Sequence, residues 1–345
     1  MKKIFIAIVV ILAIIGAIYS FTDINIGGKN TNTIKITDMR GKSIEIPKNV
    51  NSMVNLNATI DQMAYAIDKD KLKAVQPNFI DRIVILSKQD QDHLSTLPRI
   101  NAFYKPMSTE TIISIHPDII GDLTKDPKIE TKSDELGNAV VVAFCKDSID
   151  EIKDSFKLMG TVLGNEKRGQ DIYDFISTEM NMIKTKTDVQ NKKRVYYANG
   201  KDYESPGPET IMNSSLKTAG AITYWDEYNL PSQTNSTEES VAIPIESIIE
   251  YNPDVIICKT KAIHDIMIAD DRLKNVSAIK NNKIFTTHKA MIIDSIHSIA
   301  GTVWLANVIY PEIDTDDYKN FASKYYNLLY GTKLTKDDKI FDLEN

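Results

Sequence analysis

The chain has 345 residues, of which 42% are hydrophobic and 26% are charged, and its formal net charge is −6. This length suits two ordinary domains or one domain with two lobes, and the composition is that of a globular protein with a sizeable core. Lysine and arginine are scattered and the balance is mildly acidic, which argues against nucleic acid as the main partner. The two cysteines, Cys145 and Cys258, exclude a disulfide framework and any CxxC metal or redox motif.

The N-terminus predicts a membrane-targeting segment over residues 1–20. Two lysines precede sixteen uninterrupted apolar residues, from Ile4 to Tyr19. This pattern is typical of a signal anchor or a secretory signal peptide. No Ala-x-Ala cleavage site follows, so we expect an uncleaved anchor with the remainder outside the cytoplasm, and secretion if the segment is cleaved. No cysteine follows, which excludes a lipoprotein anchor. Residues 21–33 are a polar linker.

The first half of the remaining chain predicts alternating strands and helices. Residues 33–38 and 43–46 alternate apolar and polar side chains around a glycine turn, which predicts a β-hairpin. The helix around Glu110 should start after Ser108 as N-cap and end at His116, because the residue before a proline avoids the helical region. The spacing of apolar residues predicts the other elements: a helix at 58–67 and strands at 51–56, 73–76, 118–122 and 139–144.

A helical stretch follows, and then the alternation resumes. One amphipathic helix covers 148–164 and a long second one covers roughly 165–186. The later elements are strands at 194–198, 254–258 and 283–287, and helices at 209–220, around Glu246, at 271–279 and at 299–310. Strands alternating with helices on both sides of a helical connector predict two α/β lobes.

One short pattern occurs twice. "ETIISIHPDIIGD" begins at Glu110, and "ESIIEYNPDVIIC" begins 136 residues later, at Glu246. Each copy is a helix–turn–strand unit of a kind common in α/β proteins. Two copies placed symmetrically about the connector predict equivalent positions in two lobes. The predicted organisation is 34–164 for the N-terminal lobe, 165–190 for the connecting helix, 191–330 for the C-terminal lobe and 331–345 for a tail.

The order of these segments resembles the substrate-binding proteins of ABC importers for iron–siderophore, haem and cobalamin. The resemblance runs from about Thr33 to Glu312. It rests on "ITDMRGKSIEIPKNVNSMVNL", "STETIISIHPDIIG", "DSIDEIKDSFKLMGTVLGNEKRG", "PIESIIEYNPDVII", "LKNVSAIKNNKIF" and "GTVWLANVIYPE". It implies the class III periplasmic-binding-protein fold: two Rossmann-like α/β lobes joined by one long connecting helix, here preceded by one N-terminal apolar helix.

The resemblance also implies how such a protein works. The ligand sits in the cleft between the lobes, the rigid connector allows only small closure, and no cofactor or catalysis is involved. The partners are a metal-chelate ligand and the permease and ATPase subunits of an ABC transporter, and the protein is a monomer. In the cobalamin-type relatives a surface glutamate of each lobe docks on the permease, and the matching positions here are Glu110 and Glu246. The alternative role for both is a helix-start carboxylate that complements the helix dipole.

The cleft is expected at the carboxyl ends of the strands. The stretches 122–125 and 145–147 follow strands in the first lobe, and Tyr104 lies where an aromatic contacts ligand in the cobalamin-type relatives. Flat aromatic and basic side chains suit a large chelate, although an arginine cluster of the kind that anionic siderophores favour is missing. The candidate cleft residues are Asn55, Asn57, Tyr104, Lys105, Asn199, Tyr203, Trp225, His288 and Lys289.

Two other functions stay open. A free metal-ion site would need three or four N or S ligands, for which the only candidate set is Cys145, Cys258 and His288; small buried hydrophobes are the favoured role of the cysteines. An exported α/β hydrolase is the enzyme alternative, against which the chain has no G-x-S-x-G elbow and no P-loop. We therefore expect a binding protein rather than an enzyme, with iron–siderophore, haem or a corrinoid as ligand.

Overall fold

The computed structural model describes residues 32–77, 79, 86–100, 108–126, 128–231, 234–288, 295–313, 317–335, 338 and 341–342. The predicted signal anchor over 1–20 lies outside the described residues. Within the described ranges, no helix has the length and apolar character needed to cross a membrane.

The first lobe is built on a three-stranded parallel sheet, in the order β3-β4-β5, which follows an antiparallel hairpin β1–β2. Its strands are β1 (Thr33–Thr37), β2 (Ser43–Pro47), β3 (Met53–Asn55), β4 (Ile119–Leu123) and β5 (Val141–Phe144). Its helices are α2 (Ala58–Asp68), the short 3₁₀ helix η1 (Lys69–Lys71), α4 (Lys88–Thr96), α5 (Thr109–Ile115), α6 (Lys132–Glu135) and α7 (Ile149–Val162).

The second lobe is built on a four-stranded parallel sheet, in the order β11-β10-β6-β8, with a small antiparallel pair β7–β9 beside it. Its strands are β6 (Arg194–Ala198), β7 (Glu204–Ser205), β8 (Ile222–Thr223), β9 (Val241–Ala242), β10 (Val255–Cys258) and β11 (Ile284–Thr286). Its helices are α9 (Ile211–Thr218), α10 (Tyr224–Glu227), α11 (Ile245–Tyr251), α12 (Lys261–Ala269), η2 (Asp271–Leu273), α13 (Ser277–Lys280), α14 (Ser298–Ile309) and α15 (Tyr318–Tyr330).

Most predicted elements are present, with three differences. Residues 73–76 form no strand; Leu72 and Val75 make only isolated bridges to Met53 and Arg99. The single helix predicted at 271–279 is two short turns, η2 and α13. Helices α4, α6, α10, α12 and α15 and the short strands β7, β8 and β9 were not predicted.

The long helix predicted at 165–186 is α8 (Glu166–Lys186), which lies between the two sheets in chain order. It packs closely on α7, because two glycines face each other where the helices cross. A Cβ on Gly160 would come within 2.9 Å of the Gly169 Cα, and a Cβ on Gly169 within 2.8 Å of the Phe156 carbonyl. The backbones can approach this closely only because both residues lack a side chain.

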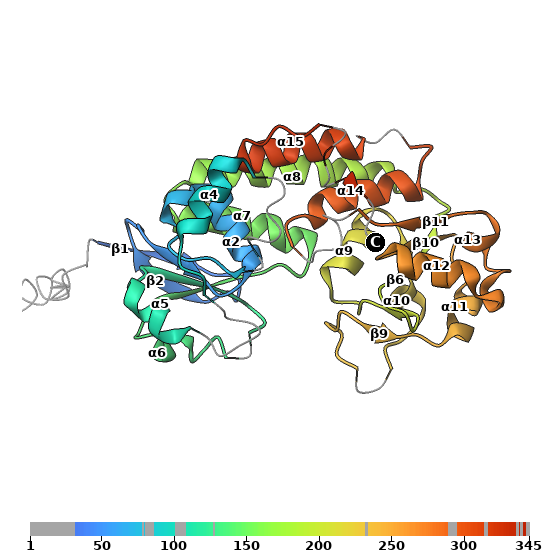
Figure 1. Ribbon diagram of the computed structural model, residues 1–345, viewed down its shortest axis with the longest axis horizontal. Helices are drawn as coiled ribbons and strands as arrows, with labels where there is room; N and C mark the ends of the chain where they lie inside the picture. Colours follow the sequence, from blue (N-terminus) through green and yellow to red (C-terminus); the bar gives the residue numbers. More distant parts are fainter. Residues whose placement is uncertain are drawn as a thin grey trace, which may run out of the picture.

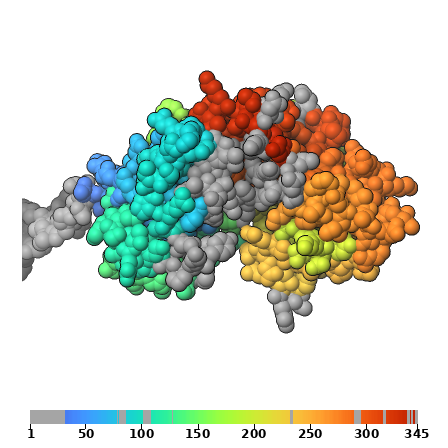
Figure 2. Space-filling view, in the orientation of Figure 1, coloured from blue at the N-terminus to red at the C-terminus, as the bar shows by residue number. Residues whose placement is uncertain are grey.

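One apolar core joins the two lobes. It contains the inward face of the first sheet, such as Met53 and Val142, and the inward face of the second sheet, such as Val195 and Ile257. Helices α2, α7, α8, α9, α14 and α15 fill the space between them. Each sheet has its own smaller core on its outward face. Figure 1 shows α8, α14 and α15 as a layer along one side of the molecule, and Figure 2 shows the surface indented between the two lobes on the other side.

Helix α15 brings the end of the chain back to the first lobe. Its Phe321 ring stacks on Phe175 of α8, with ring centroids 5.5 Å apart. From α8, the Arg168 guanidinium donates to the Leu329 carbonyl in α15 at 3.1 Å and to the Ala66 carbonyl in α2 at 3.1 Å. A single arginine therefore joins one helix of the first lobe, the connecting helix and the last helix of the chain.

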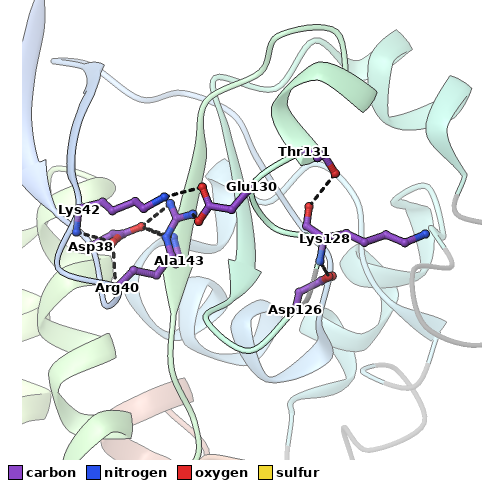
Figure 3. Close-up of polar contacts among 8 residues, drawn as sticks. All are labelled: Asp38, Arg40, Lys42, Asp126, Lys128, Glu130, Thr131 and Ala143. Atoms are coloured by element: carbon purple, nitrogen blue, oxygen red, sulfur yellow. Dashed lines mark hydrogen bonds and ion pairs between the residues drawn. The ribbon is translucent and has the colours of Figure 1, made fainter.

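A charged cluster fixes the β1–β2 hairpin to the first sheet (Figure 3). The buried Asp38 carboxylate accepts from the backbone N–H groups of Arg40 at 2.9 Å, Lys42 at 3.2 Å and Ala143 at 3.2 Å. The Arg40 guanidinium pairs with Asp38 at 2.6 Å and reaches Glu130 at 3.1 Å. Because the carboxylate is satisfied by three N–H groups and a guanidinium, its burial is compensated.

The repeated pattern folds the same way in both lobes. Helices α5 and α11 each end in a left-handed residue, His116 with φ 50° and Asn252 with φ 46°. The aspartate two residues later caps the start of the neighbouring strand: Asp118 accepts from the Ser52 N–H at 3.0 Å, and Asp254 from the Arg194 N–H at 2.9 Å. The Pro-Asp turn therefore fixes the start of β4 against β3 in the first sheet and of β10 against β6 in the second.

The shared core predicts that the two lobes unfold together. Phe321→Ala removes a fully buried ring from it and should lower the free energy of unfolding by about 3–5 kcal/mol. The two tryptophans, Trp225 and Trp304, both report on the second half of the chain. Tryptophan fluorescence and far-UV circular dichroism should give coincident transitions in the parent and the variant. Separate transitions would show that the lobes have independent cores.

Candidate functional site

A cavity of about 570 Å³ lies between the two lobes. Parallel strands of the first sheet end at its edge, so the loops after β4 and β5 deliver Lys125 and Asp147 to it. The opposite wall is one side of α9, along most of its length, with the loop before it, and α8 contributes Lys184 near its last turn. The lining residues are Lys125, Asp147, Ser148, Glu151, Lys184, Pro208, Glu209, Thr210, Asn213, Ser214, Lys217 and Thr218.

The α9 wall is held in place by local hydrogen bonds. Thr210 is its N-cap: the hydroxyl donates to the Gly207 carbonyl at 2.8 Å and accepts from the Asn213 N–H at 3.3 Å. The Asn213 amide donates to the Pro208 carbonyl at 2.8 Å. A Cβ on Gly207 would lie 2.4 Å from the Ser236 carbonyl oxygen, so the close approach of these two loops needs a glycine.

The two lobes touch beside this cavity. The first N–H of α7, at Ile149, donates to the Ser214 hydroxyl of α9 at 3.1 Å. Lys184 of α8 pairs with Asp150 of α7 at 3.5 Å. The cavity is thus bounded at one end by polar contacts that join α7, α8 and α9.

The charges that line the cavity balance. Three lysines face it, together with three carboxylates, Asp147, Glu151 and Glu209. Each lysine already has a carboxylate partner: Lys125 pairs with Asp147 at 3.3 Å, Lys184 with Asp150, and Lys217 with Asp226 at 2.8 Å. Hydroxyl and amide groups of Ser148, Thr210, Asn213, Ser214 and Thr218 supply the remaining polarity. The described lining is therefore polar and neutral in net charge.

The structure gives Asn55, the last residue of β3, and Asn57, two residues later, local structural partners. Asn55 is fully buried, and its amide donates to the Asp61 carboxylate at 3.1 Å. Its side-chain oxygen lies where a Cβ on Gly121 would come within 2.2 Å. Asn57 caps α2 by accepting from the Thr59 N–H at 2.8 Å.

In the second lobe, three predicted cleft residues have partners of their own. The Asn199 amide donates to the Ser240 hydroxyl at 2.8 Å. The Tyr203 hydroxyl donates to Asp270. The Trp225 indole N–H donates to the Pro206 carbonyl at 2.5 Å.

His288 packs against the last part of the chain. Its ring stacks on Tyr318, with centroids 5.3 Å apart, and Nδ1 contacts the Phe341 carbonyl. Burial lowers the pKa of His288 below its usual value. Tyr104, Lys105 and Lys289 lie outside the described residues. None of the six described candidates, from Asn55 to His288, is among the residues that line the cavity.

The strand-end rule predicted the stretches that contain Lys125 and Asp147, and both residues line the cavity, but the rule did not predict the α9 wall. The signal was present: a threonine N-cap followed by a helix rich in Asn, Ser and Thr suits a polar wall.

The two cysteines do not form the metal site considered from the sequence. Within the described ranges, one group of residues could offer three metal-ligand atoms within 4.8 Å of one another: Cys145, Asp147 and Glu151. Cys258 and His288 do not belong to this group. Burial raises the pKa of the Cys145 thiol to about 12, and burial likewise raises the pKa of Cys258. Both cysteines are buried and are favoured as thiols, whereas metals bind the thiolate form.

Asp122, near the end of β4, is a buried carboxyl. One oxygen accepts from the Leu123 N–H at 2.8 Å, and the other is buried without a hydrogen-bond partner in the described part of the chain. Burial raises the pKa of this carboxyl to about 7. A protonated Asp122 is thus favoured by the fold at mildly acidic pH.

The architecture is two α/β lobes that share one apolar core, with a polar cavity between them. The family model described as "Periplasmic binding protein" matches residues 53–291, and the chain belongs to this family. The resemblance identified from the sequence is confirmed at this level. The family is one of solute-binding proteins rather than enzymes, so the hydrolase alternative is set aside.

Solved structures share the fold at low identity. An ABC transporter solute-binding protein from Sulfurospirillum deleyianum superposes with TM-score 0.72 and 21% identity, over 88% of this chain and 97% of that one. The molybdate-binding protein MolA of Haemophilus influenzae gives TM-score 0.67 and 19% identity over 88% and 99%. Helicobacter pylori CeuE with bound Ni(II) gives 0.67 and 14% over 89% and 98%. No curated protein matches the sequence.

The raised pKa of Asp122 predicts that the free energy of unfolding depends on pH. A carboxyl whose pKa is higher in the folded than in the unfolded chain stabilises the fold only when protonated, so stability falls as pH rises from about 4 to about 7. Asp122→Asn removes the ionised form. It should raise the free energy of unfolding at pH 8 by on the order of 2–4 kcal/mol, with little gain at pH 4. Urea titrations at both pH values test this, and an equal effect at both would contradict it.

Proposed function

We propose that this protein captures a metal chelate in the cleft between its lobes and delivers it to an ABC importer. The observation that carries the proposal is the cavity itself: it opens between two lobes, draws its lining from both, and has the volume of a small-molecule site. Membership of the periplasmic binding protein family supports it. Iron–siderophore, haem and corrinoid complexes are the ligands we put forward, and the protein acts as a monomer.

The shared core supports a small closure. Helices α8, α14 and α15 belong to the core that both lobes share, and a packed core resists large relative rotation. We infer that α8 serves as the rigid connecting helix of the class III fold. Ligand binding then needs little reorganisation, and the free and loaded forms differ by a modest movement of the lobes.

We further propose that residues 1–20 anchor the protein in the membrane, with the binding lobes outside the cytoplasm. The apolar run after two lysines supports this. Retention in the membrane fraction after a high-salt wash would agree with it, and a mature chain beginning near Phe21 in the medium would show cleavage.

A thermal-shift panel on the full chain tests the ligand class. Ferric siderophores, haem, cobalamin, a Ni(II)–histidine complex and molybdate form the panel, since neighbours of the same fold bind the last two. One chelate should raise the melting temperature in proportion to the logarithm of its concentration. Stabilisation by molybdate alone would replace the chelate with an oxyanion.

Variants of the cavity should weaken binding of that chelate without unfolding the protein. Lys125→Ala and Glu209→Ala alter opposite walls, and each should cost about 1 to 3 kcal/mol of binding free energy if the ligand contacts it. Tyr104→Ala and His288→Ala test the contacts predicted from the sequence. Lys35→Ala, on the hairpin surface, is the control. Unchanged affinity in all four cavity and cleft variants would place the ligand elsewhere.

Glu110 and Glu246 are proposed as the permease-docking carboxylates. Both are exposed on equivalent helices of the two lobes. Removing them should shift unfolding only slightly and leave ligand affinity unchanged, because an exposed helix-start carboxylate contributes little to stability. The double variant Glu110→Ala, Glu246→Ala should bind ligand normally and fail to stimulate the transporter ATPase. Normal stimulation would leave both residues as helix-start carboxylates.

A further inference from the structure

The repeated unit exposes an isoleucine as well as a glutamate in each lobe. In α5, Glu110 is exposed, and Ile113 keeps 39% of its surface accessible. In α11, 136 residues later, Glu246 is exposed, and Ile249 keeps 40% accessible. The preceding isoleucine of each helix is fully buried in the outward core of its sheet. Each helix thus places one isoleucine in the core and the next on the surface.

This coincidence is not the ordinary scatter of apolar side chains on a surface. The large hydrophobic side chains that are exposed in the described part of the chain are Ile113, Ile249, Ile266 and Ile268. Single exposed apolar residues are common and need no explanation. Ile266 and Ile268 fit that description, because they belong to α12 of the second lobe alone. Ile113 and Ile249 occupy the same position of the same repeated unit, with almost the same exposure.

Each isoleucine is a neighbour of its glutamate. Residues three apart in a helix lie on one face, so Glu110 and Ile113 form one patch and Glu246 and Ile249 form another. The described residues provide no ion pair or hydrogen bond to either carboxylate. Figure 1 shows α5 and α11 on different lobes, both on the opposite side of the molecule from α8 and α15. The shared core holds the two patches at a fixed separation.

We propose that Ile113 and Ile249 are apolar anchors that insert into two equivalent hollows of the importer's permease, each beside a basic group that binds the glutamate of the same patch. This rests on the proposed function for the identity of the partner. A partner that contacts the same pair twice must present the same surface twice, as a two-fold permease does. An apolar side chain buried beside a paired charge supplies affinity, while the charge supplies registration and on-rate.

Two other occupants fit the patches less well. A second copy of this chain, placed face to face, would bring glutamate against glutamate, which is repulsive. An anionic membrane surface would repel the same carboxylates. The two carboxylates therefore favour a partner that presents basic groups.

The test compares matched serine variants of the full chain. Ile113→Ser and Ile249→Ser should each weaken binding to the reconstituted permease–ATPase complex in nanodiscs by about tenfold, and the double variant by about a hundredfold. Ile266→Ser with Ile268→Ser, equally exposed but without a counterpart, should bind like the parent. Raising the salt concentration should weaken binding of the parent, because salt screens its two glutamates. The ratio between the affinities of the parent and the serine variants should stay unchanged. The double variant Ile113→Thr, Ile249→Thr keeps the β-branched shape, so it controls for a folding defect in the serine variants.

The outcomes separate this proposal from the proposed function. If the double serine variant binds like the parent while Glu110→Ala, Glu246→Ala does not, the anchors are overturned and docking stands. If the parent itself neither binds nor stimulates the complex, both are overturned. The anchors are also overturned if the serine variants abolish self-association in sedimentation runs or binding to anionic vesicles, because the occupant is then a second copy or a membrane.

Discussion

The apolar core shared by the two lobes is the constraint on which the rest of the structure depends. Each sheet turns one face toward this core, and α7, α8, α9, α14 and α15 fill the space between them. Close-packed interiors deform little, so the lobes hold a nearly fixed relation. Arg168 strengthens this frame, because a single guanidinium binds the carbonyls of α2 and α15 from a position on α8.

The same frame explains why the cavity is polar. Its walls are the loops that follow β4 and β5, helix α9 with the loop before it, and the ends of helices α7 and α8, where polar groups must remain satisfied. Lysines and carboxylates pair across these ends, and α9 adds hydroxyl and amide groups. A neutral, polar lining favours ligands that are themselves close to neutral, or that carry charges of both signs, over a highly charged anion.

The Pro-Asp units show one local solution used twice. A left-handed residue ends the helix, proline prevents its continuation, and the aspartate takes the N–H groups that begin the neighbouring strand. These positions serve the fold. The exposed glutamate and isoleucine do not, since they face solvent while the isoleucine beside each exposed one is in the core. This division within a single unit separates residues that build the lobe from residues that are free to contact a partner.

The sequence by itself determined many of the elements, because hydrophobic periodicity, glycine turns and Pro-Asp boundaries are local signals. Among them are the β1–β2 hairpin, the strands of the first parallel sheet, three of the four strands of the second, α7, α8 and the equivalent positions of Glu110 and Glu246. Only the tertiary structure decided which polar residues reach the cavity. Asn55 lies at the carboxyl end of strand β3, where the rule expects a cleft residue, yet Gly121 and Asp61 enclose it. Thr210 and Asn213 lie at the start of helix α9 and not at the carboxyl end of a strand in a parallel sheet, yet α9 brings them to the opposite wall. Burial and cavity lining depend on contacts between residues far apart in the chain, such as Ile149 with Ser214, and no local pattern encodes such a contact.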